Sequence, residues 1–132
     1  MSKPAKDYCE KLLLQKIAAN EKNNIAGNWV FEKFHEKDYD YDEFKTKYPM
    51  GSEGYKNLAR FASNGELIGT LVNQELLSED LVFDLWGAML WERVEPILLG
   101  MRKEANMPRM HENYEVCAKK YKAWTEKNPP KV

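Results

Sequence analysis

The chain has 132 residues, of which 43% are apolar and 31% are charged, and its formal net charge is −1. A chain of this length buries roughly two-thirds of its unfolded surface, so we expect one domain over residues 1–132 that folds without disulfides or metals. The balanced charge gives no reason to expect nucleic acid or an anionic membrane as a partner. Two isolated cysteines, Cys9 and Cys117, lack metal-ligand spacing and predict reduced thiols.

Targeting segments are not evident in the sequence. The leucine run 12–14 is too short for a signal peptide, and it is flanked by Lys11 and Lys16. The uncharged run 67–74 is far below the roughly 20 residues that a membrane-spanning helix needs. We therefore expect a cytoplasmic location, by elimination.

The first fifty residues predict short helical segments whose topology is undetermined. We expect a helix over residues 4–20, because apolar residues recur there on one helical face. Asn23 and Asn24 interrupt this helix and Gly27 weakens the stretch that follows, so we expect a kink or break there. A second segment over residues 25–34 has near-helical spacing. Asp42 is a candidate cap for a short helical turn that Pro49 ends.

The rest of the chain predicts three long helices. Small and apolar residues recur at three- and four-residue steps over residues 52–73. Ser78 is a good N-cap for the next helix, which we expect to continue to about Met101, to lie at the centre of the domain and to bend at Pro96. The last helix begins near Pro108. The whole pattern predicts an all-α antiparallel bundle of about four main helices.

Three glycines inside these helices predict close packing between backbones. In an antiparallel hairpin of the two central helices, Gly65 and Gly87 lie at the same level, and Gly69 shares the face of Gly65. Each interior glycine costs about 1 kcal/mol relative to alanine, so a steric reason is expected. The alternative is that the glycines relieve crowding by Trp86 and Trp91.

An incomplete metal motif occurs near the end of the second segment. Glu32 and His35 form the Glu-x-x-His spacing that di-iron carboxylate bundles use twice. His111 and Glu115 are four residues apart, so a joint site of these four residues is conceivable. The pattern is only half complete, and we prefer surface or capping roles for both histidines. The sequence therefore predicts no metal and no other cofactor.

Arg93 is a charge on a largely apolar helical segment, between Met89 and Ile97. We expect it to be partly buried and to have a carboxylate partner. One hypothesis is that it holds an anionic ligand in a pocket lined by Trp86 and Leu90. The alternative, which we favour, is a structural ion pair or an extended side chain that reaches water.

The charges are unevenly distributed. Residues 61–91 contain five acidic residues and no lysine or arginine, whereas residues 115–132 contain five lysines and two glutamates. Such segments can mark a surface for a partner, or they can pair between copies of the protein. Ordinary solvated faces are the simpler interpretation.

Short motifs in the second half of the chain have a recognisable arrangement. They are Glu75 to Val82, Trp86-Gly87, Trp91-Glu92, Pro96, Arg102 and Glu112 to Glu115. Together they resemble a family of small bacterial helical proteins that is known only as a domain of unknown function, over roughly residues 55–121. The resemblance implies a helical bundle of bacterial or phage origin without assigned catalytic residues. Within it, Trp91, Glu92 and Arg102 are candidates for more than packing, and an ion pair between the last two helices is the simpler alternative.

The predicted function is a non-catalytic protein-interaction or regulatory module, which binds a protein partner or forms a homodimer. Its support is the surplus of aromatic residues, with four Trp, seven Tyr and five Phe. Phosphate loops, nucleophile elbows and Cys-x-x-Cys pairs are missing from the sequence, so we name no catalytic residue. The alternative is a bundle that binds a small ligand or a metal, with an enzyme as one option.

Overall fold

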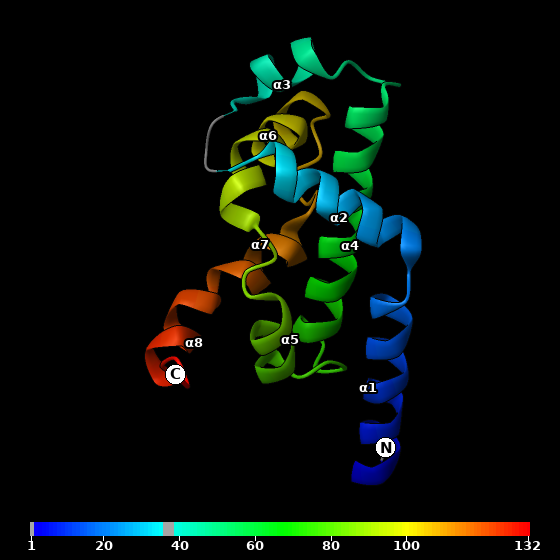
Figure 1. Cartoon of the computed structure of the whole chain (residues 1–132), viewed down its shortest axis with the longest axis vertical. Helices are drawn as coiled ribbons and strands as arrows, with labels where there is room; N and C mark the ends of the chain where they lie inside the picture. Colours follow the sequence, from blue (N-terminus) through cyan, green and yellow to red (C-terminus); the bar gives the residue numbers. More distant parts are fainter. Residues whose placement is uncertain (1, 36–38) are drawn as a thin grey trace.

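The computed structural model describes residues 2–35 and 39–132, and these residues form eight α-helices without any strand (Figure 1). The helices are α1 (Lys3–Ala18), α2 (Glu21–Lys33), α3 (Tyr41–Lys47), α4 (Glu53–Asn73), α5 (Glu79–Trp86), α6 (Trp91–Glu104), α7 (Glu112–Lys119) and α8 (Tyr121–Lys127). The all-α prediction is confirmed, whereas four main helices are too few. Among the described residues, no helix combines the length and apolar character needed to cross a membrane.

Side-chain caps explain where five of these helices begin. The side chains of Ser2, Asn20, Asp40, Ser52 and Ser78 each accept a hydrogen bond from the backbone N–H three residues later. Such caps satisfy amide groups that have no partner inside the helix. The predicted cap of α3 was wrong by two residues, since Asp42 lies in the first turn of the helix. The predicted break at Gly27 was also wrong, because α2 continues through it and the break falls at residues 19–20.

The predicted helix from Ser78 to Met101 is interrupted. Gly87 ends α5 and has φ +56° and ψ −139°, a conformation that residues with a Cβ atom rarely adopt. Met89 and Leu90 follow in the left-handed region, with φ of +56° and +58°. The chain therefore changes direction at residues 87–90, and Pro96 lies inside α6.

Helix α4 packs between α2 on one side and α7 on the other (Figure 1). A Cβ on Gly65 would lie 2.6 Å from two ring carbons of Tyr114. A Cβ on Gly69 would lie 2.7 Å from the carbonyl carbon of Asn113 and 2.8 Å from the nitrogen of Tyr114. The close approach is therefore between α4 and α7, not between the two helices of the expected hairpin. Gly87 does not take part in this close approach, and glycine is required there because the backbone has a positive φ.

Tyr114 of α7 lies fully buried at the centre of the core. Its ring meets the ring of Trp91 edge to face, with centroids 4.9 Å apart. Its hydroxyl donates a hydrogen bond to the carbonyl of Met89, which satisfies a polar group that would otherwise be buried without a partner. The strained turn at residues 87–90 is thus tied to the core.

Helix α8 lies beside α5 near the C-terminus of the chain (Figure 1). The ring of Phe83 contacts the rings of both Tyr121 and Trp124. Trp124 Nε1 donates to Asp80, at 2.7 Å, and Lys131 Nζ lies 3.0 Å from a carboxylate oxygen of Asp84. The acidic segment and the lysine-rich C-terminal segment therefore contact each other within one chain.

Candidate functional site

A groove of about 620 Å³ lies between α2, α4 and the turn at residues 87–90, and the C-terminal end of α1 closes one end. All 14 residues that line it are uncharged, in a chain of which 31% is charged. Seven of them have large apolar side chains: Ile17, Phe31, Phe61, Ile68, Trp86, Met89 and Leu90. Four more are asparagines, at positions 23, 24, 28 and 64. The groove is therefore an apolar surface with neutral hydrogen-bonding groups among its lining residues.

Asparagine side chains brace the groove. Asn23 Nδ2 donates to Asn64 Oδ1 at 3.1 Å, which joins α2 to α4. Asn24 Nδ2 donates to the carbonyl of Ala18 at 3.0 Å, which joins α2 to the end of α1. Both contacts are neutral, so they hold the helices without adding charge to the lining. The sequence predicted only a helix break at Asn23 and Asn24, and their place in the groove was missed; the four-residue spacing of Asn24 and Asn28 was the available signal.

Gly27 leaves space in the groove. A Cβ at this position would meet only Phe61 Cδ2, at 4.0 Å, which is an ordinary van der Waals contact. Alanine would therefore fit, and it would make a better helix by about 1 kcal/mol. The glycine in α2 has no steric requirement of the kind seen at Gly69, and its effect is to keep the groove open.

The turn at residues 87–90 supplies one wall. Met89 and Leu90 hold left-handed backbone conformations, which cost non-glycine residues on the order of 1–3 kcal/mol each. Their side chains line the groove together with Trp86. Strained residues of this kind are found preferentially at ligand clamps and switch regions.

Arg93 is not among the residues that line the groove. Its Nη1 donates to the carbonyls of Phe34, at 3.0 Å, and Phe31, at 3.4 Å, at the C-terminal end of α2. Its guanidinium also lies 5.0 Å from the centroid of the Phe31 ring. The partners of Arg93 are therefore backbone carbonyls, not the carboxylate that the sequence predicted. Trp86 and Leu90 do line a pocket, but that pocket has no cation to hold an anionic ligand.

An ion pair joins α6 to α7. Arg102 Nη1 lies 2.9 Å from Glu115 Oε1, and each side chain is only 18% exposed. Burial alone would raise the pKa of Glu115, but hydrogen bonds from Lys119 and Arg102 lower it overall. The other two candidates lie apart from this pair: Trp91 donates through Nε1 to Glu95, and Glu92 is exposed. The arrangement clamps two helices.

The candidate metal ligands are not brought together. Glu32 and His35 are exposed near the end of α2, His111 is the N-cap residue of α7, and Glu115 is held by Arg102. In the part of the chain that the structure describes, no three His, Cys, Asp or Glu side chains are grouped as a metal ion would require. Burial lowers the pKa of His111; the charge of Glu66 opposes this shift, and that of Arg102 adds to it.

A polar network that the sequence analysis missed organises the start of α7. Glu66 Oε1 accepts from the N–H of Tyr114 at 2.9 Å, and Glu66 Oε2 accepts from Asn113 Nδ2 at 3.0 Å. Asn73 Nδ2 donates to both oxygens of Asn113. A carboxylate at a helix N-terminus is stabilised by the helix dipole. Glu66 lies between Gly65 and Gly69 on α4, and that small-residue setting was the available signal.

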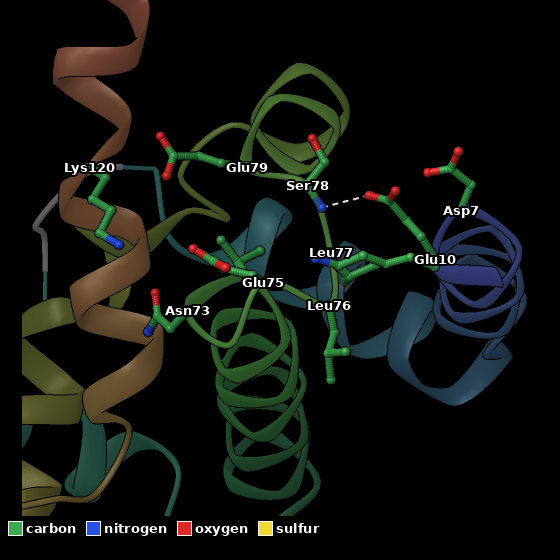
Figure 2. Close-up of a pocket in the computed structure, with 11 residues that line it drawn as sticks. Asp7, Glu10, Asn73, Glu75, Leu76, Leu77, Ser78, Glu79 and Lys120 are labelled. Carbon is green, nitrogen blue, oxygen red and sulfur yellow. Dashed lines mark hydrogen bonds between the residues drawn. The ribbon is translucent and has the colours of Figure 1, made fainter. Parts of the chain in front are cut away.

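A second depression, of about 390 Å³, lies between α1 and the turn that joins α4 to α5 (Figure 2). Figure 2 shows Glu10 of α1 pointing toward Ser78, whose backbone N–H donates to Glu10 Oε1 at 2.6 Å. The lining contains carboxylates and the two lysines Lys6 and Lys120. The hydrogen bond between Glu10 and Ser78 anchors α1 to the start of α5. Because the lining has charges of both signs and Glu10 is already engaged, we assign this depression a structural role.

Comparison with known proteins places most of the chain in one family. A family model described as a domain of unknown function (DUF4760) matches residues 11–121. The match begins within α1, so it includes the first helices that the sequence motifs of residues 55–121 did not cover. No curated protein and no solved structure matches the chain significantly.

Proposed function

The chain belongs to the DUF4760 family, and we propose that it is a non-catalytic docking module that binds a protein segment in the uncharged groove between α2, α4 and residues 87–90. The observation that carries this proposal is the complete absence of charge among the 14 lining residues. The centres of protein–protein interfaces are depleted in charged residues and enriched in aromatic residues and methionine. The groove has that composition.

Exposed aromatic surface supplies the driving force in this proposal. Phe31 is 57% exposed, and Phe61 and Trp86 are partly exposed in the same groove. Full burial of a side chain such as phenylalanine contributes about 1.5–3 kcal/mol. The asparagines offer both donors and acceptors, so they can satisfy polar groups of a partner at the edge of the apolar contact.

A small uncharged ligand is the second candidate, because the volume of about 620 Å³ lies in the range of ligand pockets. The ligand in that case is apolar and neutral. The anionic ligand considered for Arg93 has no support in the lining, since Arg93 is engaged with the end of α2.

The test is a displayed library of helical peptides of about 16 residues, selected on the full chain and then counter-screened on Gly27→Leu. Leucine at this position extends toward Phe61 and narrows the groove. Gln15→Leu is the matched control, because it adds the same side chain to an exposed position of α1 outside the groove. We expect clones that bind the wild type and Gln15→Leu and lose at least tenfold in binding to Gly27→Leu.

A second variant guards against misfolding. Phe31→Ala removes an exposed groove side chain and leaves the core intact, and circular dichroism verifies the fold of each variant. If no clone depends on Gly27 or Phe31, the docking function is wrong. If native mass spectrometry instead finds a stoichiometric neutral small molecule on the wild type and not on Gly27→Leu, the small-ligand function replaces it.

A further inference from the structure

We infer that the partner segment is an amphipathic helix with acidic residues along one edge, and that this edge meets Lys56 and Arg60 of α4. This inference rests on the proposed docking function of the groove. It goes further by naming the charge of the partner and the residues that recognise it.

A basic depression adjoins the uncharged groove. It has a volume of about 550 Å³ and shares Asn23 and Asn64 with the groove, so the hydrogen-bonded pair of asparagines forms their common border. Lys56 and Arg60 line it, and no carboxylate does. They are four residues apart on α4 and therefore on one face of the helix. Leu67 also lines this depression and is 49% exposed, which extends the apolar surface beyond the groove.

Both cations are available to a partner. Within residues 2–35 and 39–132, no hydrogen bond or ion pair engages Arg60. Lys56 Nζ lies 3.8 Å from Glu53 Oε1, and these side chains are 64% and 88% exposed, so this ion pair contributes little to stability. Arg93 and Arg102, in contrast, are held by groups of the same chain.

The combined surface resembles the grooves that bind amphipathic helices. An apolar groove receives the apolar face of a helix, whose side chains recur at three- and four-residue steps. Cations along one border favour carboxylates on the corresponding edge of that helix and disfavour lysines there. The two depressions together exceed the usual 300–1,000 Å³ of a small-ligand pocket, which favours a longer occupant.

The acidic helix of a second copy is a poorer occupant. Helix α5 carries exposed Leu81 and Leu85 next to acidic residues. Its Asp80 already accepts a hydrogen bond from Trp124, however, and its Asp84 pairs with Lys131 within the same chain. A separate protein with an unpaired acidic edge fits the basic border better.

The test uses a displayed helical library in which the apolar face varies and the edge positions encode glutamate and lysine equally. It is selected on the wild type, on Gly27→Leu and on the double variant Lys56→Glu/Arg60→Glu. The control is Lys122→Glu/Lys127→Glu, which has the same net charge as the double variant but changes α8, away from the groove.

Among selected clones whose binding depends on Gly27, we expect glutamate to be about fivefold to tenfold more frequent than lysine at the edge positions, both on the wild type and on the control. Two partly exposed ion pairs would produce a preference of this size. On Lys56→Glu/Arg60→Glu the preference should reverse, and 0.5 M salt should weaken it in every case. Equal use of glutamate and lysine, or a preference that survives the charge reversal, would overturn the acidic helix and leave the docking function standing. A wild-type dimer in light scattering that Gly27→Leu dissociates would replace the partner by a second copy. If no clone depends on Gly27, both proposals fail.

Discussion

Replacing Gly69 by alanine tests the close contact between α4 and α7 on which the fold depends. The new Cβ would lie 2.7 Å from the carbonyl carbon of Asn113 and 2.8 Å from the nitrogen of Tyr114. Ordinary contact begins near 3.4 Å, and the carbonyl oxygen of Asn113 lies nearer still, so the two backbones must separate by more than roughly 0.7 Å. Backbone atoms cannot rotate away as a side chain does, and the hydrogen bonds of Glu66 and Asn73 across this contact lengthen with the separation.

The magnitude follows from three opposing effects. Overpacking costs about 1–3 kcal/mol, and weakening a hydrogen bond to the carboxylate of Glu66 costs about 1.5–3 kcal/mol. The better helix propensity of alanine returns about 1 kcal/mol. We therefore expect Gly69→Ala to lower the free energy of unfolding by about 1.5–5 kcal/mol. For 132 residues this corresponds to a fall in Tm of roughly 5–18 °C, measured by circular dichroism.

Gly27→Ala is the matched control, because it makes the same change in a helix that has room for it. Its Cβ meets only Phe61 Cδ2, at 4.0 Å. We expect the free energy of unfolding to rise by about 0.5–1 kcal/mol. A Gly69→Ala protein as stable as the wild type would refute the close approach of α4 and α7. Equal losses from both substitutions would show that the loss has another origin.

Three further predictions use the titratable and charged residues. Burial lowers the pKa of His111 below its usual value of about 6.5, so as the pH falls the unfolded chain is protonated at this residue before the folded protein, and the stability declines below about pH 6.5. In urea unfolding at pH 7.5 and 5.0, His111→Asn should therefore lose less stability between the two pH values than the wild type, and equal losses would contradict this. Burial raises the pKa of the Cys117 thiol to about 11, so a thiol reagent at pH 8 should modify only Cys9 in the folded protein and both cysteines in guanidinium, whereas two fast equivalents in the folded protein would contradict the burial. Arg93→Met removes the two guanidinium bonds to the end of α2 and should lower the free energy of unfolding by about 1–2 kcal/mol, and an unchanged Tm would show that these bonds do not stabilise the helix.

Local chemistry made the helix boundaries predictable where a cap was present. Ser78 was expected to begin a helix and does so, because its hydroxyl accepts from the N–H of Leu81. The expected helix over residues 52–73 matches α4, whose small and apolar face is buried. These features depend on residues within one or two helical turns, which a sequence displays directly.

The partner of each buried face was not predictable in the same way. The pattern of α4 shows that Gly65 and Gly69 face another element, but it contains nothing about which element. We expected the next helix along the chain, and the structure has α7, some forty residues later. Periodicity identifies the buried face of a helix, whereas the neighbour depends on the path of the chain between the two helices.

The candidate site was foreseen only in part, for a related reason. The hypothesis that was not favoured for Arg93 had Trp86 and Leu90 lining a pocket, and both line the groove. Arg93 was placed beside them in that hypothesis, but its side chain extends from the first turn of α6 to the C-terminal end of α2 instead. The asparagines were missed because the same residue type breaks helices, caps them and lines interfaces, and only the packing of α2 on α4 distinguishes these roles.

The interruption at residues 87–90 is the deviation from the sequence pattern that matters most for function. In a continuous helix the carbonyl of Met89 would accept from the N–H of Arg93, whereas here that N–H bonds to the carbonyl of Leu90. The carbonyl of Met89 is thereby free to accept from the hydroxyl of Tyr114, which would otherwise be buried without a partner at a cost of about 1–3 kcal/mol. That gain helps to offset the left-handed conformations of the turn, and the same turn directs Met89 and Leu90 into the lining of the groove. A residue 25 positions later in the sequence thus stabilises the break in the helix, and the break shapes the surface on which we propose a partner docks.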